Sequence, residues 1–120
     1  MTFGHNDLLP ANFLDDGERL WLIDFEYAGL NTAMFDLAGA ASNAGMTTGQ
    51  SEELLAEYFG RKPDHDLLRS HAAMQCASLL RESMWSMVSE IHSAIDFDFG
   101  GYTAENLARF ESAYREFRAI

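Results

Sequence analysis

The chain has 120 residues, of which 48% are hydrophobic and 12% aromatic, so it can bury the core of one domain spanning residues 1–120. A net charge of −11 argues against a nucleic-acid partner, which needs a basic surface, and a single cysteine excludes an intrachain disulfide. No apolar run approaches the ~20 residues that cross a bilayer, and no secretory signal pattern is present, so we expect a cytoplasmic protein with no membrane partner.

The first informative segment is His5-Asn6-Asp7-Leu8-Leu9-Pro10-Ala11-Asn12. The spacing His-x-Asp-x-x-x-x-Asn is typical of catalytic loops that transfer a phosphoryl group, where the Asp takes the proton of the acceptor hydroxyl and the Asn holds a metal ion. A short apolar strand then ends at Asp24, a second carboxylate. An Asp near an Asn more often marks a turn. Here three residue types match at fixed offsets, so the pattern predicts Asp7 as general base and Asn12 and Asp24 as Mg²⁺ ligands.

A β-hairpin is predicted between the two metal ligands. Residues 12–14 and 20–23 have the composition of short strands, and Asp15-Asp16-Gly17-Glu18 between them is rich in turn residues. Such a hairpin would bring Asn12 and Asp24 to the same end of a small sheet, where one ion could contact both. Residues 1–29 are therefore interpreted as a catalytic loop and metal-binding hairpin.

Residues 30–120 are predicted to be helical, which makes the fold class mainly α with a small β-hairpin. We expect helices over about 33–43, from an N-cap at Ser51 to a stop at Gly60, from Pro63-Asp64 onward, and at the C-terminal end. In the longest helix an apolar stripe recurs at helical spacing and is predicted to be buried: Leu80, Met84, Met87, Val88, Ile91 and Ile95. His65, His71 and His92 are expected on helix surfaces.

Glu82 and Trp85 lie one helical turn apart, beside that stripe. A carboxylate next to an aromatic face suits a cation, because a quaternary ammonium gains ~0.5–2 kcal/mol from each ring it contacts. Tyr102 is a weaker candidate for the same pocket. The alternative for these aromatic residues is ordinary core packing.

Together with Ile23-Asp24-Phe25-Glu26-Tyr27-Ala28-Gly29 and Phe35-Asp36-Leu37-Ala38, the segment from His5 to Asn12 resembles the choline/ethanolamine kinase family, within the aminoglycoside phosphotransferase-like superfamily. A looser resemblance runs from Trp85 to Phe110. The resemblance implies the C-terminal, substrate-binding lobe of the protein-kinase-like fold. It also implies ATP as phosphoryl donor, Mg²⁺ as cofactor and a small cationic alcohol as substrate.

The same resemblance implies roles around the catalytic loop. Asp7 would be the base, with Asn12 and Asp24 as the Mg²⁺ ligands. His5 would anchor the loop, and Asp36 would be a buried acid that braces it. Glu26 would support the metal site or face the substrate.

For the substrate pocket, the resemblance implies aromatic residues on the late helices, which Trp85 and Tyr102 match. Two positions depart from the family pattern: Glu82 replaces a Trp of eukaryotic members, and Asn43 replaces an acid on a preceding helix.

The acceptor remains open between several small molecules. Leu9 and Glu26 stand where protein kinases carry a Lys and the Gly of Asp-Phe-Gly, which favours a small-molecule acceptor. The Asp-Phe-Glu-Tyr run favours choline or ethanolamine over an aminoglycoside, thiamine or homoserine. A further alternative is a non-catalytic binding module with a kinase-like fold.

The chain contains no Gly-x-Gly-x-x-Gly segment, so we expect the N-terminal lobe that clamps ATP to be absent from it. The isolated chain is therefore predicted to lack sustained choline-dependent ATP consumption, measured with a coupled ADP assay. Steady turnover by the 120-residue chain would contradict this. We also expect a homodimer through the exposed lobe interface, which sedimentation at high concentration would test.

Overall fold

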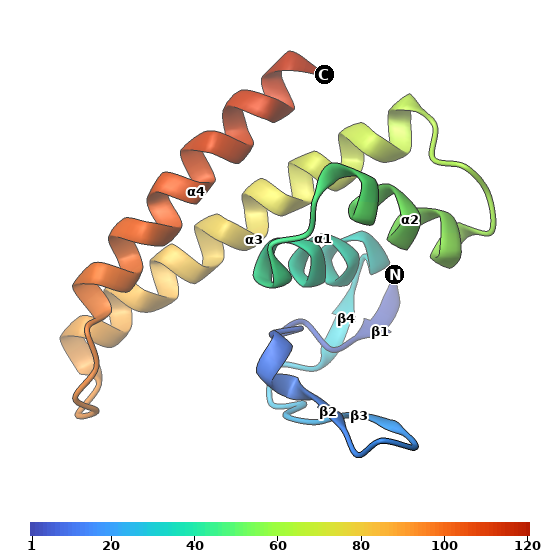
Figure 1. The fold of residues 1–120 in the computed structure, drawn as a ribbon. Coiled ribbons are helices and arrows are strands. Elements are labelled where there is room, and N and C mark those ends of the chain that lie inside the picture. Colours follow the sequence, from blue (N-terminus) through green and yellow to red (C-terminus); the bar gives the residue numbers. More distant parts are fainter.

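A computed structural model describes residues 1–120 (Figure 1). In chain order the elements are β1 (Thr2–Gly4), the short 3-10 helix η1 (Pro10–Asn12), β2 (Phe13–Asp15), β3 (Leu20–Leu22), β4 (Gly29–Asn31), α1 (Ala33–Ala44), α2 (Thr48–Phe59), α3 (His65–His92) and α4 (Phe99–Ala119). The chain is mostly helical with short antiparallel strands, which confirms the predicted fold class. None of its helices combines the length and apolarity needed to cross a membrane.

The strands form two separate antiparallel pairs. The predicted hairpin is β2–β3, with Phe13 opposite Leu22, and it projects away from the helices (Figure 1). Just beyond it, the N–H of Ile23 donates to the carbonyl of Asn12 at 2.9 Å, so Asn12 and Asp24 flank the open end of the hairpin. The second pair, β1–β4, was not predicted; it joins Gly4 to Gly29 and closes the segment that contains the catalytic loop.

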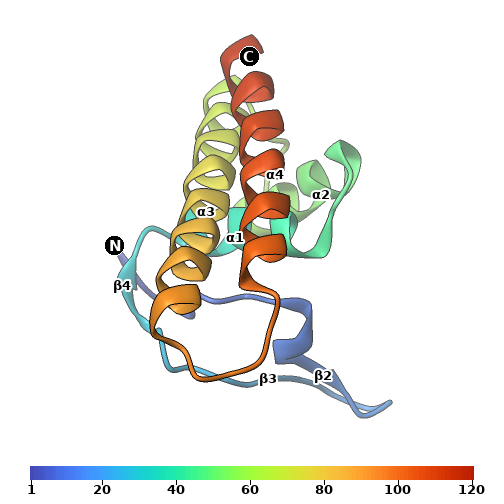
Figure 2. The same ribbon diagram turned by 90° about the vertical axis from the view of Figure 1, so that its left-hand side faces the viewer.

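The two longest helices, α3 and α4, lie side by side and antiparallel, while α1 packs against α3 and α2 follows beside it (Figures 1 and 2). A small core lies at the α1–α2–α3 junction, built from Met34, Leu37 and Leu55, with Leu54, Leu67, Leu68 and Met74 packed against it. This core holds α3 against α1, so residues of α3 can reach the catalytic loop.

Helix boundaries follow capping chemistry. Asp64 caps α3 by accepting the N–H of Leu67 at 2.9 Å, as its position after Pro63 predicts. The expected N-cap at Ser51 is wrong, because α2 begins one turn earlier. Thr47 and Gln50 there form a reciprocal capping box, in which the Gln50 side chain accepts the N–H of Thr47 at 2.9 Å.

The apolar stripe predicted to be buried on α3 is exposed, so that prediction is wrong. Exposed fractions along it run from 38% at Leu80 through 58% at Val88 to 77% at Ile91. The face of α3 that is buried carries mainly small or polar side chains instead: Cys76, Ser78, Leu79, Glu82, Ser83 and Ser86.

Hydrogen bonds explain why serines can occupy this buried face. The Ser83 hydroxyl donates to the carbonyl of Leu79 at 2.9 Å, and the Ser86 hydroxyl donates to the carbonyl of Phe99 at 2.8 Å. Thr103 on α4 donates to the Ser86 oxygen at 2.7 Å. Because these hydroxyls are satisfied and small, they fit between closely packed helices at little energetic cost. Hydrophobic periodicity therefore indicated the wrong face.

His71 is also placed differently from the prediction. We expected it on a helix surface, but it is 4% exposed on the inner side of α3, near the backbone of Leu37 in α1. Burial lowers the pKa of its imidazole, so the neutral ring is the stable form in the folded protein.

The two faces of α3 give a matched test in two adjacent leucines. Leu79 is 4% exposed and Leu80 is 38% exposed. Leu79→Ala is expected to lower the free energy of unfolding by about 2–5 kcal/mol because it opens a cavity, whereas Leu80→Ala should cost about 1 kcal/mol or less. Urea unfolding followed by circular dichroism measures both. A larger loss for Leu80→Ala than for Leu79→Ala would show that the stripe is buried after all.

Candidate active site

The catalytic loop, residues 5–12, is held at its start by Asp36 in the first turn of α1. The N–H of His5 donates to Asp36 Oδ2 and the N–H of Asn6 donates to Oδ1, both at 2.8 Å. A Cβ on Gly4 would lie 2.9 Å from Asp36 Oδ2, so only glycine allows this approach. One carboxylate thus fixes two successive peptide groups just before Asp7.

The buried ring of His5 joins the start of the loop to the open end of the hairpin. Its Nε2 lies 2.8 Å from the carbonyl oxygen of Ile23, and the N–H of Asp7 donates to its Nδ1 at 3.2 Å. These partners require the proton on Nε2 and a lone pair on Nδ1. The ring also meets Phe25 edge-on, with centroids 4.6 Å apart. His5 therefore sets the distance between the loop and the residue before Asp24, and its two nitrogens are already occupied.

Two residues of the site have left-handed backbones. Asn6 has φ 67° and Asp24 has φ 63°, and no other non-glycine residue of the chain has a positive φ. Asn and Asp tolerate this region better than other residues, but the conformation persists only where neighbours hold it. Asn6 is held through its side chain as well, which donates to the carbonyl of Tyr27 at 3.0 Å.

Three carboxylates converge next to the loop: oxygens of Asp7, Asp24 and Glu26 all lie within 4.8 Å of one another. Asn12 is buried, and its amide donates to the carbonyl of Asp7 at 2.9 Å, which ties it to the first of these residues. Carboxylate and amide oxygens are the ligands that Mg²⁺ prefers, and a divalent ion would relieve the repulsion among three like charges. The donor set therefore fits Mg²⁺.

Asp7 is half-buried, and its surroundings shift the pKa of its carboxyl in opposite directions. Burial raises the pKa of its carboxyl, the positive charge of Arg81 lowers it, and the negative charges of Glu82 and Asp24 raise it. The net result is a raised pKa. A cation bound among the carboxylates would act in the opposite direction and favour the ionised form.

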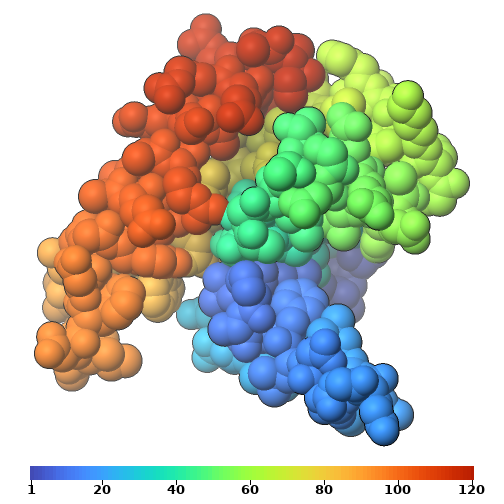
Figure 3. Space-filling model, in the orientation of Figure 1, coloured from blue at the N-terminus to red at the C-terminus, as the bar shows by residue number.

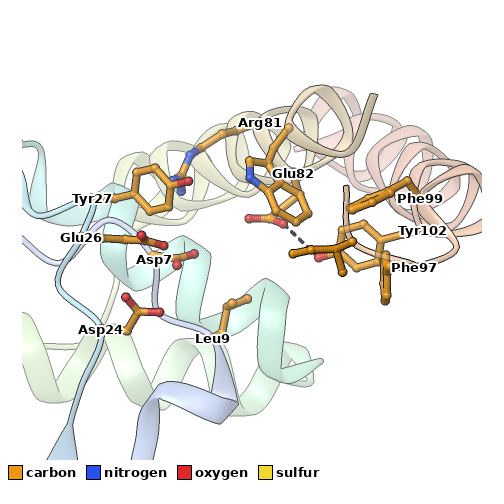
Figure 4. A pocket seen from close by; sticks show the side chains of 12 residues that line it. Asp7, Leu9, Asp24, Glu26, Tyr27, Arg81, Glu82, Phe97, Phe99 and Tyr102 are labelled. Atoms are coloured by element: carbon orange, nitrogen blue, oxygen red, sulfur yellow. Dashed lines mark hydrogen bonds between the residues drawn. The ribbon is translucent and has the colours of Figure 1, made fainter. Parts of the chain in front are cut away.

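Asp7 lies in a pocket of about 420 Å³. One wall comes from the catalytic loop and hairpin end (Asp7, Leu9, Asp24, Glu26 and Tyr27), and the other from α3, the α3–α4 turn and α4 (Arg81, Glu82, Trp85, Ile95, Phe97, Phe99 and Tyr102). Figure 4 shows Asp7, Asp24 and Glu26 on one side, with the Tyr27 ring, and Glu82 with the rings of Phe97, Phe99 and Tyr102 on the other. In Figure 3 the surface is hollowed between these two parts of the chain.

The second wall combines aromatic rings with one buried carboxylate. The Tyr102 hydroxyl donates to Glu82 Oε2 at 2.9 Å (Figure 4), and ring centroids of Trp85 and Phe97 lie 6.2 and 5.9 Å from that of Tyr102. Burial first, and then Glu82, raise the pKa of Tyr102 to about 12, so the hydroxyl stays a donor. This wall can accept a cation at the carboxylate and a methylated ammonium on the rings.

The structure brings most of the predicted site residues together but not Asn43. Asn43 does not line the 420 Å³ pocket; its amide donates to the carbonyl of Leu8 at 3.2 Å, in a separate small cavity beside Asp36. Asn43 is therefore not among the residues that line the wall of Glu82, Trp85 and Tyr102. Phe97 and the buried Phe99 also line the pocket.

Sequence reasoning also missed Arg81, which lines the pocket and contacts the catalytic loop. Its position next to Glu82 and one helical turn before Trp85 could have indicated that it lies near the same pocket.

Comparison with known proteins agrees with this geometry. Residues 1–46 match the family model described as "Choline/ethanolamine kinase". The chain is 27% identical over 114 residues to "Protein LicA" of Haemophilus influenzae and 31% identical over 121 residues to "Probable ethanolamine kinase" of Arabidopsis thaliana, with 92% and 85% of this chain covered. Over most of its length the chain is similar to choline/ethanolamine kinases.

A solved structure shows the same similarity. The choline/ethanolamine kinase family protein from Mesorhizobium loti superposes with a TM-score of 0.85 at 28% identity, over 93% of this chain and 38% of that one. The chain spans 42% of the LicA length and 32% of the Arabidopsis protein.

The bracing carboxylate gives a testable consequence. In Asp36→Asn, one of the two backbone N–H groups loses its acceptor and meets an amide N–H₂ group, which is expected to lower the free energy of unfolding by about 1–3 kcal/mol. Asp96→Asn, in the exposed α3–α4 turn, should stay within about 0.5 kcal/mol of wild type. Chemical unfolding measures both variants, and equal stabilities would mean that Asp36 does not hold the loop.

Proposed function

We propose that this chain supplies the base, metal and acceptor sites of an ATP- and Mg²⁺-dependent kinase that phosphorylates the hydroxyl of a small amino alcohol of the choline or ethanolamine type. The observation that carries the proposal is the continuous pocket that joins Asp7 to the aromatic wall of Trp85 and Tyr102. The similarity to choline/ethanolamine kinases supports a small-molecule kinase. The carboxylates and aromatic rings of the two pocket walls support a cationic amino alcohol as the acceptor.

Asp7 is proposed as the general base. The acceptor oxygen forms a bond to the γ-phosphorus of ATP, the bond from that phosphorus to the ADP oxygen breaks, and the hydroxyl proton passes to the Asp7 carboxylate. Since phosphoryl transfer depends mainly on alignment and charge neutralisation, the fixed loop backbone before Asp7 matters as much as its basicity.

Asn12 and Asp24 are proposed to hold Mg²⁺, with Glu26 supporting the site through the cluster it forms with Asp24 and Asp7. When bound, the ion would neutralise negative charge on the phosphates. His5 and Asp36 are proposed to act only as supports, because their polar atoms are engaged by the backbone.

The acceptor end is proposed to be cationic. Four carboxylates line the pocket against one guanidinium, so the pocket carries an excess of negative charge that attracts a cation. Glu82 would pair with the ammonium, while Trp85 and Tyr102 would contact its methyl or methylene groups. The acceptor hydroxyl would then point across the pocket toward Asp7.

A panel of acceptors assayed with the full-length protein tests this function. Choline or ethanolamine should be phosphorylated with a higher kcat/KM than an aminoglycoside, thiamine or homoserine. Asp7→Asn should lower kcat by about 10²–10⁴-fold, because the carboxylate that takes the proton is lost. Faster turnover of another alcohol would overturn the acceptor, and an active Asp7→Asn variant would overturn the base.

Trp85→Ala, in the same assay, should raise the KM for choline by about 2–30-fold, the equivalent of one cation–π contact. Trp21 offers a matched control, because it is 47% exposed against 45% for Trp85 but lies on the hairpin outside the pocket. Trp21→Ala should leave the KM unchanged.

A further inference from the structure

Arg81 connects the pocket wall formed by Glu82, Trp85 and Tyr102 to the catalytic loop, 75 residues away in sequence. It lies on α3 directly before Glu82, and its guanidinium donates to the carbonyl of Asn6, the residue that precedes Asp7. The side chain is half-buried, and it lines both the main pocket and the small cavity behind the loop.

The same guanidinium lies over two aromatic rings. Its Cζ is 5.0 Å from the ring centre of Tyr27, in the segment that follows Asp24, and 5.7 Å from that of Phe35 in α1. Figure 4 shows the Arg81 side chain extending from α3 toward the Tyr27 ring, above Glu26 and Asp7. One side chain therefore contacts the loop, the segment after Asp24 and α1, and is itself anchored on the acceptor helix.

Arg81 and Asp36 hold Asn6 from both sides. Asp36 accepts the N–H of Asn6, and Arg81 donates to its carbonyl, so the peptide groups before and after this residue both have fixed partners. Asn6 has φ 67°, a conformation that persists only where its surroundings determine it. The carbonyl that Arg81 contacts belongs to the peptide that leads into Asp7, so the direction of the Asp7 side chain depends on this contact.

We propose that Arg81 is a positioning residue that fixes the catalytic loop against the acceptor-binding helix, so that Asp7 and the Glu82–Trp85 wall keep one separation. The inference rests on the proposed function in assigning Asp7 as the base, but the contacts themselves do not depend on the substrate. A lysine cannot replace this arrangement, because it lacks the planar group that stacks on Tyr27 while donating in its own plane.

Arg69 provides a matched control on the same helix. Its Cζ lies 4.7 Å from the ring centre of Phe117, and it donates to the carbonyl of Ile120 at 3.3 Å, so it too combines stacking with one backbone contact. It lies outside the pocket.

Amide hydrogen exchange of the 120-residue chain, followed by NMR, tests the positioning role without any substrate. In Arg81→Met the amides of Asn6, Asp7 and Leu9 should exchange about tenfold faster or more, since a hydrogen bond that holds the loop is lost. Amides in the middle of α3 and α4 should keep their rates. Arg69→Met should leave the loop amides unchanged, and Arg81→Lys should not restore them.

Two exchange results would overturn the proposal. Unchanged loop rates in Arg81→Met would show that the contact does not hold the loop. Acceleration throughout α3 and α4 as well would show that Arg81 only supports the fold.

Kinetics of the full-length protein give a second, independent readout. Arg81→Met should lower kcat by about 10–100-fold, as expected for a misplaced base, while the KM for choline changes less than about threefold. A raised KM with unchanged kcat would make Arg81 a substrate contact instead and overturn the positioning role. If wild type phosphorylates neither choline nor ethanolamine, the proposed function fails, and the exchange result alone decides whether Arg81 positions the loop.

Discussion

The site depends on the carboxylate of Asp36, which accepts the N–H groups of His5 and Asn6 at the entry to the catalytic loop. Hydrogen bonds from neutral backbone to an ionised carboxylate are among the strongest that a protein forms, and here they direct a peptide that must adopt a left-handed backbone. Because α1 carries Asp36 and also packs on α3, the same helix orients the loop and supports the helix that faces it. The placement of the loop that carries Asp7 therefore depends on the helical core.

The parts of the site that the sequence predicts are those where chemistry fixes spacing. Asp7, Asn12 and Asp24 were proposed as site residues from their offsets along the chain, and turn residues between Asn12 and Asp24 predict the β2–β3 hairpin. Helices α1, α3 and α4 follow from composition, Asp64 marks the start of α3, and Gly60 marks the end of α2. All of these signals lie within a few residues of the feature they predict.

The parts that sequence reasoning missed depend on contacts between distant segments. The contact of Arg81 with Asn6 spans 75 residues and uses a backbone carbonyl, which carries no sequence signature. The buried face of α3 was assigned to the wrong side, since periodicity measures hydrophobicity, whereas Ser83 and Ser86 are buried through their size and hydrogen bonds. Asn43 was placed in the pocket although its position on α1 directs it behind the loop.

The serine-lined contact between α3 and α4 also determines how the acceptor pocket can change. Hydrogen bonds of hydroxyl groups are directional, so those of Ser86 and Thr103 and the carbonyl of Phe99 set the spacing of the two helices. This spacing cannot increase gradually, as it could at an apolar interface. A single added methyl group in this contact would separate Trp85 on one helix from Tyr102 on the other. Residues 93–98, which connect the helices, are free of that restriction and include Ile95 and Phe97 of the pocket wall. The shape of the 420 Å³ pocket is therefore easiest to alter in this turn, while the helix pair keeps its separation.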